Sequence, residues 1–528
     1  MREYRDLILP IAILTLIVTI AIYFRPLLIL DETRYVSVAW EMFNSGNYFV
    51  PTLNNLPYDH KPPLLFWLIN LDWHLFGVNE TSIRFIPLLF SIGNIILSYK
   101  IYKEIFQDDR VGAKLLAWVI VGGVIYSFYT TLFMFDIMLS FWVLLSIYAG
   151  ICAIKYDRLR DYALLAFGIG FGILAKSPVI VAHLLPLYLF ASYWSSSRVK
   201  FSFYIKGLFA LMAGIAIALI WAIPAAKMGG EAFAYGIFWG QYAGRAVNAF
   251  AHKHSFWWYL PWIPILLFPW ILSSSFWSGL KEFTKNSLNS GEKFLIVWIV
   301  GTILIFSLIS GKQIHYIAPE FLAFAIVTTR VISISKDRRY KANFLGVFFI
   351  ILSTFLYTTP FIIKGYISTL IDIKANLLAA TILLIYGIFL IKKEFNSKES
   401  FIKVLSLNSL ILIFVIHLVA HIYLKQQNLT NFSKEILKLE RRGIEVAHFG
   451  KYHNQYRFLG RLKRPLTIIY SKNSINEYIK NHPNGAIITY LKRDIKYNKK
   501  AIIAVTKFRT QNALLVKAKE WNKLLLLP

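Results

Sequence analysis

Two carboxylates and a lysine stand out among the polar residues of this chain. Asp31 and Glu32 directly follow an apolar stretch, residues 8–30, that is long enough to cross a membrane. Charges at such a position cost free energy unless they face water, a partner or a substrate, although they also serve simply to end a membrane helix. Lys61 precedes two prolines, which keep its backbone out of the α region and make it a fixed point charge suited to phosphate. These residues therefore indicate either a substrate site with phosphate recognition or plain solvated charge.

The composition places these residues in a membrane protein. Of the 528 residues, 57% are hydrophobic and only 16% are charged, whereas soluble proteins carry about 25% charged residues. Lys plus Arg number 57 and Asp plus Glu 28, which gives a formal net charge of +29. The single cysteine, Cys152, excludes an intramolecular disulfide and a Cys-rich zinc module. The composition excludes a disordered chain and argues against a soluble enzyme.

Long apolar stretches predict an α-helical polytopic membrane protein with about 13 transmembrane helices. Only the tripeptide from Lys176 to Pro178 separates the fifth and sixth stretches. We count them as two helices because a proline there would end a helix. The stretches centre on residues 8–30, 85–101, 115–130, 133–153, 162–176, 178–194, 205–224, 256–277, 294–310, 315–333, 343–363, 374–391 and 405–424.

The Lys and Arg residues of the short loops predict the orientation. With the N-terminus in the cytoplasm, every inner loop carries at least three cations, whereas the outer loops are sparser for their length. This orientation puts loops 31–84 and 225–255 on the outer side, and an odd number of spans places the C-terminus there too. The first stretch reads as a permanent anchor, since it is too long for a signal-peptide core.

Residues 425–528 differ from the rest of the chain. They contain 22 Lys plus Arg and 6 Asp plus Glu, a net charge of +16. Strand-like runs at 466–470, 486–490 and 501–505 are separated by turn signals, and residues 474–480 read as a short helix capped by Ser474. We therefore predict a transmembrane domain, residues 1–424, and a small basic α/β domain, residues 425–528, on the outer face.

The outer loops resemble a known family, the bacterial lipid A 4-amino-4-deoxy-L-arabinose transferases. These belong to the C-type glycosyltransferases, which use polyprenyl-phosphate sugars and are related to protein O-mannosyltransferases. The first loop carries the most specific part of the resemblance, and the matches run in order from residue 31 to about residue 320. The matching segments are Asp31–Tyr35, Gly46–Pro51, Tyr58–Trp67, Phe76-Gly77, Arg84-Phe85, Phe135-Asp136, Phe238–Arg245, Trp257–Pro261 and Ser310–Pro319.

The resemblance implies a fold, an activity and a set of site residues. The fold would be that of the C-type glycosyltransferases, in the bacterial inner membrane with the active site facing the periplasm. The enzyme would move a sugar from an undecaprenyl-phosphate donor to a phosphate of lipid A. Asp31 matches the family's catalytic aspartate, and Asp136 matches a second acidic position facing the cavity. Lys61, Arg245 and Tyr316 match positions that grip the carrier phosphate.

Other polar residues in the same segments are further candidates. Lys312 is a candidate for binding phosphate, and four residues are candidates for other substrate groups: Glu32, Arg34, Tyr58 and His315.

A divalent metal is a separate question, since no cofactor is required by the residues. The family pattern usually has Glu directly before the Lys-Pro-Pro lysine, where this chain has His60. Candidate nitrogen and oxygen ligands remain, although we favour interfacial side chains without a metal. These candidates are Asp59, His60, His252 and His254.

Several functions stay open on the sequence alone. The same donor chemistry would serve a protein or another glycan as acceptor, and the sugar is not fixed by the motifs. A transporter for a lipid-linked sugar would favour repeated halves and mid-membrane polar residues, a pattern that this sequence lacks. A structural assembly protein would leave the loop between Asp31 and Lys61 without a purpose. The basic charge indicates membrane lipids rather than nucleic acid as neighbours, and the oligomeric state is open.

Overall fold

The structure, a computed structural model, describes residues 4–240, 253–285, 287–337, 340–363, 371–493 and 495–524. The chain forms two compact units, in both of which segments far apart in sequence pack together. The bundle unit comprises Met1–Tyr23, Asp59–Leu65 and Thr81–Ala420. The sheet unit comprises Phe24–Tyr58, Phe66–Glu80 and His421–Pro528. Most of the predicted first outer loop thus belongs to the same unit as the C-terminal region, while the predicted domain division at residue 424 stays a prediction.

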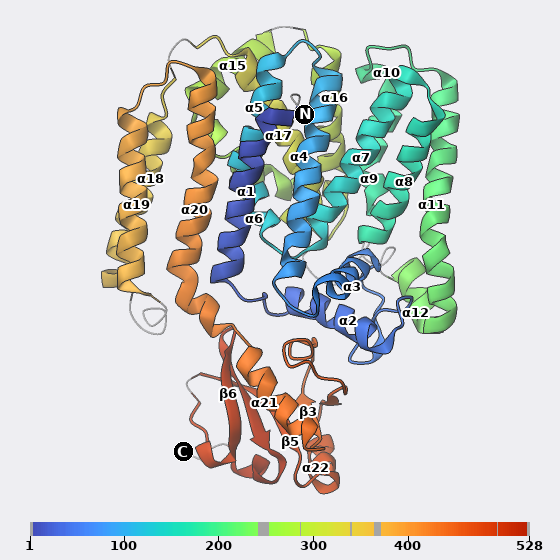
Figure 1. The fold of residues 1–528 in the computed structure, drawn as a ribbon, viewed down its shortest axis with the longest axis vertical. Coiled ribbons are helices and arrows are strands. Elements are labelled where there is room, and N and C mark those ends of the chain that lie inside the picture. The colour runs from blue at the N-terminus through green and yellow to red at the C-terminus, as the bar shows by residue number, and fades with distance from the viewer. Residues whose placement is uncertain are drawn as a thin grey trace. The chain divides into compact units, whose positions relative to one another are not determined.

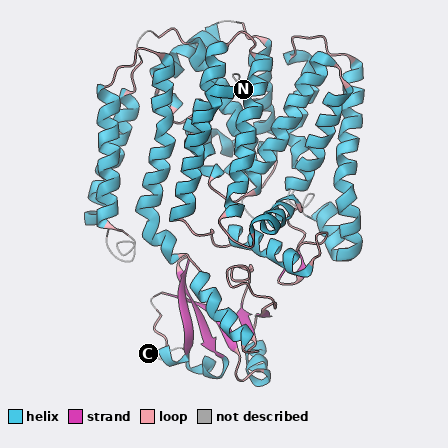
Figure 2. Cartoon of the chain, in the orientation of Figure 1, coloured by secondary structure: helices cyan, strands magenta, loops and turns pink. Residues whose placement is uncertain are grey.

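Nearly all of the bundle unit is helical (Figures 1 and 2). Among the described residues, nine helical segments are long and apolar enough to cross a membrane, and a helix pair bent by 64° raises the number to ten if it forms one span. That pair is α5 (Arg110–Gly122) and α6 (Val124–Thr130). The nine segments contain α1 (Arg5–Phe24), α4 (Ile86–Ile105), α7 (Phe135–Tyr156), α11 (Phe201–Gly229), α16 (Ser290–Leu308), α17 (Ala318–Ile334), α18 (Asn343–Ile362), α19 (Ile373–Lys392) and α20 (Lys398–Gln426).

The prediction of about thirteen spans is therefore wrong in number, because prolines and charges interrupt several apolar stretches. In the stretch 256–277, Pro261, Pro264 and Pro269 accompany a series of short elements in place of one long helix. The stretch 178–194 is likewise divided. The short elements are η4 (Phe256–Trp262), α14 (Ile263–Leu266), η5 (Trp270–Leu272), α15 (Ser274–Lys285), α9 (Val179–Leu189) and α10 (Ala191–Trp194).

Small residues let the membrane helices approach closely, as they do in other helical membrane proteins. In α18 and α19, a Cβ atom on Gly346 would lie 2.7 Å from the carbonyl oxygen of Gly387, and one on Gly387 would lie 2.8 Å from that of Gly346. A side chain at either position would force the two backbones apart. Another helix, α8 (Leu159–Lys176), packs between α7 and α11 and returns the chain toward the start of α7.

Short elements link several of the long helices, and one of them holds the candidates His315 and Tyr316. The turn η2 (Ser82–Phe85) precedes α4, and η6 (Ile314–Ile317) precedes α17. Two further elements, α12 (Glu231–Tyr235) and η3 (Gly236–Gly240), follow α11.

The sheet unit combines helices from the first loop with a small mixed sheet. Its five strands lie in the order β4-β3-β5-β7-β6, with β3 parallel to β4 and β5, and β7 antiparallel to β5 and β6. A two-stranded hairpin, β1 with β2, comes from the first loop. The elements are α2 (Asp31–Ser45), β1 (Thr52–Leu53), β2 (Leu56–Pro57), α3 (Leu64–Phe76), α21 (Thr430–Arg441), β3 (Val446–Phe449), β4 (Thr467–Ile469), α22 (Lys472–Asn481), β5 (Ala486–Lys492), η8 (Lys499–Ala501), β6 (Ile502–Phe508), β7 (Gln511–Lys517) and η9 (Ala518–Lys523).

The small C-terminal α/β region is confirmed in outline. The three predicted strand runs correspond to β4, β5 and β6, whereas β3 and β7 were not predicted. The predicted short helix is α22, but its N-cap is Ser471, whose side chain accepts a hydrogen bond from the backbone N–H of Ser474.

Candidate active site

A buried ion pair lies at the start of α7. Asp136 is in the first turn of that helix and is 2% exposed. Its carboxylate pairs with the ammonium of Lys176, the last residue of the antiparallel neighbour α8. The end of α8 is positioned by the short turn after α7, which brings the two helices back side by side. Because buried charges are costly unless they are paired, this pair fixes both helix ends.

Further cations and aromatic rings surround this pair. The Lys176 ammonium lies 5.0 Å from the centre of the Tyr316 ring, and the Lys61 ammonium lies 5.4 Å from the centre of the Phe135 ring. Lys61 and His315 both interact electrostatically with the Asp136 carboxylate. We call Lys61, Asp136, Lys176, His315 and Tyr316 the cationic cluster.

The cationic cluster carries more positive than negative charge. Two ammonium groups, those of Lys61 and Lys176, face one carboxylate, that of Asp136. In surroundings of low dielectric constant such an excess attracts an anion strongly. The cluster therefore has the charge and the donors to hold a phosphate group.

Lys176 was not among the residues that the sequence predicts for the site. It stands at the end of an apolar stretch, where a lysine usually marks the membrane boundary. The available signal was the tripeptide from Lys176 to Pro178, which separates two apolar stretches. Its middle residue, Ser177, has φ 82° and ψ 178°, a conformation that costs an L-residue about 1–3 kcal/mol and is found mainly at functional sites.

Lys312 occupies a buried position close to the cationic cluster in sequence. It is 2% exposed, and its ammonium donates to the carbonyl oxygens of His254, at 3.0 Å, and Ile309, at 2.6 Å. Burial lowers the pKa of Lys312. Two of its three donors thus join the backbone after α16 to the segment before η4, and its predicted role in binding phosphate stays a prediction.

The sheet unit holds the other predicted catalytic residue at the first position of α2. The Asp31 carboxylate accepts a hydrogen bond from Arg34 at 2.7 Å, and 56% of its side chain is exposed. The preceding residue, Leu30, has φ 77° and ψ −57°, which is again a strained region for an L-residue. Asp31 therefore begins a helix at a fixed backbone position while its carboxylate stays accessible.

Glu32 and Arg34 are held by neighbours within the sheet unit. Glu32 is fully buried, and one of its oxygens accepts from Arg25 at 2.7 Å and from the N–H of Leu28 at 2.8 Å. Burial of Arg34 disfavours its charged form and acts to lower its pKa. The side chains of Tyr58, Tyr35 and Asp31 outweigh this effect and raise the pKa of Arg34.

These contacts give Glu32 and Arg34 clear structural partners. Tyr58 is 5% exposed and lies near Arg34. The substrate-binding roles of Glu32, Arg34 and Tyr58 stay predictions.

The metal candidates are only partly brought together. Asp59 and His60 lie with Oδ1 and Nε2 3.6 Å apart, while the His254 ring stacks on Trp258 with centroids 4.7 Å apart. Within the described residues, no group of three or more His, Cys, Asp and Glu side chains is placed to hold a metal ion. Arg245 and His252 lie outside the described residues, so their predicted roles stay predictions.

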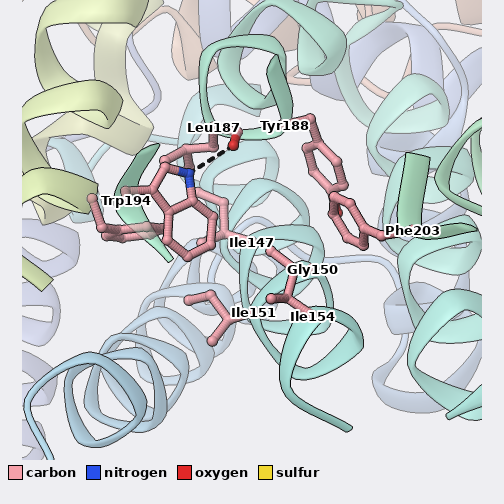
Figure 3. A pocket seen from close by; sticks show the side chains of 9 residues that line it. Ile147, Gly150, Ile151, Ile154, Leu187, Tyr188, Trp194 and Phe203 are labelled. Carbon is pink, nitrogen blue, oxygen red and sulfur yellow. Dashed lines mark hydrogen bonds between the residues drawn. The ribbon is translucent and has the colours of Figure 1, made fainter. Parts of the chain in front are cut away.

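An apolar recess lies elsewhere in the bundle unit, between α7, α9, α10, α11 and α16 (Figure 3). Its lining includes Ile147, Ile154 and Tyr188, and Trp194 donates from Nε1 to the carbonyl of Leu187 at 2.8 Å. At 1.5 Å per residue, Ile147 lies about 16 Å along α7 from Asp136. The recess is thus separate from the cationic cluster and brings no charged side chain to it.

Known proteins resemble this chain in sequence. Residues 60–221 match the family model described as dolichyl-phosphate-mannose-protein mannosyltransferase. An undecaprenyl phosphate-alpha-4-amino-4-deoxy-L-arabinose arabinosyl transferase of Enterobacter sp. (strain 638) is 28% identical over 345 residues, 62% of this chain and 60% of that protein. Arabinosyl transferase 2 of Pseudomonas fluorescens (strain Pf0-1) is 30% identical over 314 residues, 56% of this chain and 54% of that protein. The matches thus span no more than 60% of the length of these relatives.

A solved structure shares the fold. The crystal structure of ArnT from Cupriavidus metallidurans bound to undecaprenyl phosphate matches with a TM-score of 0.74 and 15% identity, over 96% of this chain and 97% of that chain. The chain is ArnT-like in sequence and in fold. The predicted family resemblance is therefore confirmed, and with its candidate spans this ArnT-like chain is a multi-pass integral membrane protein.

Proposed function

We propose that this ArnT-like chain is a membrane glycosyltransferase that moves a sugar from undecaprenyl phosphate to a phosphate of lipid A. The observation that carries the proposal is the cationic cluster, in which Lys61 and Lys176 lie around Asp136 in a bundle with an ArnT-like fold. The named activity of the sequence relatives supports the choice of an amino sugar such as aminoarabinose.

The cationic cluster would act on the donor. Breaking the bond between the sugar and its phosphate builds negative charge on the departing phosphate. Lys61 and Lys176 would stabilise that charge, and the Tyr316 hydroxyl would donate a hydrogen bond to it. Arg245, proposed from the sequence resemblance, would add a bidentate contact. No nucleotide is required, since the carrier phosphate is itself the leaving group.

Asp31 would act on the sugar or the acceptor. A phosphate acceptor has a second pKa near 6 and is largely ionised at neutral pH, so it needs little help from a base of pKa about 4. We therefore propose that Asp31 positions the sugar or stabilises positive charge that develops on its anomeric carbon. Attack by the acceptor from the face opposite the phosphate would invert the anomeric configuration.

The proposed setting is the inner membrane, with the site open to the periplasm. The distribution of Lys and Arg in the loops supports this orientation. The donor and lipid A would then reach the site from the outer leaflet, and no soluble carrier would be needed.

A second acceptor class is favoured by one observation. Residues 60–221 match a family described by protein mannosyl transfer. The same donor chemistry would then deliver the sugar to a hydroxyl, and a general-base role would suit Asp31 better.

Mass spectrometry of lipid A tests the proposal directly. A deletion strain should lack one lipid A species, and complementation with the wild-type gene should restore it, while Lys61→Ala should not. Unchanged lipid A with altered glycoproteins would favour the second acceptor class. Unchanged glycans of both kinds would reject the proposal and favour a transporter. Asp31→Asn with activity within threefold of wild type would remove Asp31 from the chemistry.

A further inference from the structure

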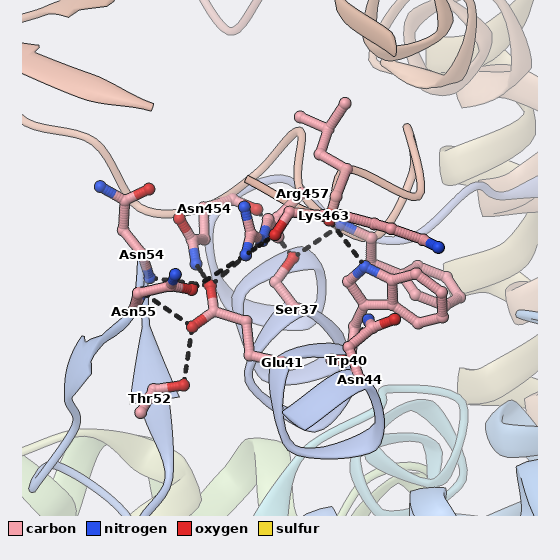
Figure 4. A network of polar contacts seen from close by, with 12 residues as sticks. Ser37, Trp40, Glu41, Asn44, Thr52, Asn54, Asn55, Asn454, Arg457 and Lys463 are labelled. Carbon is pink, nitrogen blue, oxygen red and sulfur yellow. Dashed lines mark hydrogen bonds and ion pairs between the residues drawn. The ribbon is translucent and has the colours of Figure 1, made fainter. Parts of the chain in front are cut away.

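A buried carboxylate in the middle of α2 joins three segments of the sheet unit. Glu41 is 4% exposed. Its two oxygens accept hydrogen bonds from the Thr52 hydroxyl at 2.7 Å and from the Asn454 side-chain amide at 2.6 Å (Figure 4). One carboxylate of the first loop is therefore bound to a residue more than 400 positions later in the sequence.

The turn of the β1–β2 hairpin directs two backbone N–H groups at the Glu41 carboxylate. Its two turn residues, Asn54 and Asn55, have φ values of 56° and 62°, as a tight two-residue turn requires and as Asn tolerates better than most residues. Their backbone N–H groups both donate to Glu41, each at 2.9 Å. The hairpin is thus fixed to α2 through its turn.

Arg457 balances the buried charge and extends the contacts. Its Nε lies 3.4 Å from a Glu41 oxygen, and Arg457 is 3% exposed. Its Nη2 donates to the side chain of Asn55 and to the carbonyl of Lys463, both at 2.9 Å. The cation therefore binds the helix, the hairpin and the C-terminal loop at once.

Two further sets of hydrogen bonds connect the hairpin and α2 to the C-terminal loop without involving Glu41 or Arg457. The side chain of Asn54 both donates to the carbonyl of Leu466 and accepts from its N–H, each at 2.9 Å. The Trp40 indole donates to the carbonyl of Leu462 at 3.0 Å. The loop between β3 and β4 thus contacts α2 and the hairpin at several points between Asn454 and Leu466.

The other end of α2 is also anchored. The buried pair of Arg25 and Glu32, 2.7 Å apart, fixes the chain just before and after the start of the helix. At 1.5 Å per residue, Glu41 lies about 15 Å along α2 from Asp31, too far for it to touch the same reacting atoms. Because a helix is rigid, contacts that fix α2 at two points also fix the position of Asp31 at its start.

We infer that the C-terminal region holds α2 in place and so positions Asp31 for the reaction, with Glu41 and Arg457 as positioning residues. This inference rests on the proposed function, because it takes Asp31 to be catalytic. It assigns a positioning task to the loop 454–466. Removing one charge of the pair would leave the other buried without its partner, which is the costly case for such pairs.

The experiment compares Glu41→Gln and Arg457→Met with a matched surface variant in the full-length protein. Glu435→Gln serves as the control, since Glu435 forms an exposed pair with Lys438 in α21. Hydrogen exchange is measured over Asp31–Ser45 and over the membrane helices, and kcat and KM of sugar transfer are measured with the undecaprenyl-phosphate donor.

We expect amides of α2 to exchange at least tenfold faster in Glu41→Gln and Arg457→Met, with exchange in α7 and α17 unchanged. We expect kcat to fall at least tenfold and KM for the donor to stay within threefold. The double variant should be no worse than the worse single variant, because neither charge is then left alone. The control should match wild type throughout.

Two results would overturn the inference. One is unchanged exchange in α2, and the other is faster exchange in α2 with unchanged kcat. The proposed function would fail in a different way. In that case Asp31→Asn would retain activity, or the wild-type protein would transfer no sugar. The hydrogen-exchange measurement depends on neither result.

Discussion

Two ion clusters at the two ends of α17 differ in the balance of their charges. At the start of the helix, Tyr316 adjoins the pair of Asp136 and Lys176. Near its end, Arg330 pairs with Asp109 at 3.0 Å and with Glu292 at 3.1 Å. About 21 Å of helix separates Tyr316 from Arg330.

The Arg330 cluster is saturated with local partners. Asp109 accepts from the Tyr102 hydroxyl and from the N–H of Gly112, each at 2.8 Å. Glu292 accepts from the N–H of Asn289 at 3.1 Å in a capping box. Burial acts to raise the pKa of Asp109, but the hydrogen bonds that its carboxylate accepts, from Ser333, Gly112, Tyr102 and Arg330, outweigh burial and lower that pKa.

The comparison separates an ion cluster that joins helices from one that we propose binds the donor phosphate. In the Arg330 cluster one guanidinium faces two carboxylates, and each carboxylate also accepts hydrogen bonds from neutral donors. In the cationic cluster two ammonium groups face one carboxylate, beside the ring of Tyr316 and the strained backbone of Ser177. An excess of one sign of charge is what a substrate of the opposite sign would need.

The largest effect should come from Arg330→Met, on stability. The change leaves the carboxylates of Asp109 and Glu292 buried without their cation, which costs about 3–5 kcal/mol in comparable cases. Thermal unfolding in detergent should show a clear loss, while kcat per folded molecule stays within threefold. Lys336→Ala, which removes an exposed partner of Glu282, is the control. A loss of kcat without a loss of stability would contradict the structural assignment.

Lys61→Ala should affect activity rather than stability. Loss of one donor to a developing oxyanion typically costs a factor of about 10²–10³ in kcat. Steady-state transfer assays with undecaprenyl-phosphate sugar measure it. Lys403→Ala removes an exposed lysine paired with Glu399 and should behave as wild type. Activity of Lys61→Ala within threefold of wild type would show that the charge excess is not used.

Lys176→Met should have an intermediate effect on activity. It removes one of the two ammonium groups but leaves Lys61 in place, so we expect a loss of about 10–100-fold, equal to about 1.4–2.8 kcal/mol. The matched variant is Lys155→Met, whose ammonium pairs with Glu104 at 2.9 Å near the other end of α7. Equal losses in both variants would mean that Lys176 serves only to hold helices together.

The smallest effect concerns an uncharged network in the sheet unit. Burial lowers the pKa of His448 to about 4, and its ring bonds the Tyr490 hydroxyl at 3.0 Å. The unfolded chain, with an ordinary His pKa near 6.5, binds more protons than the folded one between pH 6.5 and 4, so stability falls as pH falls through this window. We expect a loss of about 1 kcal/mol between pH 6.5 and 5.5.

Hydrogen exchange of β3 and β5 in the full-length protein, corrected for intrinsic rates, measures this loss. His448→Gln should remove the pH dependence, and His482→Gln, at the end of α22, should leave it in place. Exchange in wild type that is independent of pH over this range would show that His448 does not titrate differently on unfolding.

Parts of the fold follow from local sequence. Apolar stretches such as those of α7 and α11 predict membrane helices, because a span must satisfy its backbone internally and expose apolar side chains. The prolines within the stretch 256–277 indicated that this stretch would not form one long helix, but the prediction of a span there relied on hydropathy alone. The strand-like runs of β4, β5 and β6 could be recognised from their composition and the turn signals between them, whereas β3 and β7 were not predicted.

The candidate site divides in the same way. Asp31, Lys61 and Asp136 could be predicted as candidates because they stand in recognisable motifs at the ends of apolar stretches, and their roles stay predictions. Lys176 was missed, since its meaning depends on a pair formed across 40 residues of sequence. Glu41 and Arg457 carry no motif at all.

The sequence by itself determined that this chain enters a membrane many times and carries a loop typical of sugar transfer from lipid phosphates, because hydropathy and short motifs are local properties. Only the tertiary structure decided which charges lie together and how deeply they are buried. Examples are the pair of Asp136 with Lys176 and the pair of Glu41 with Asn454. The interaction energy of each pair depends on its burial and on the distance between its atoms, and both are set only when the chain folds.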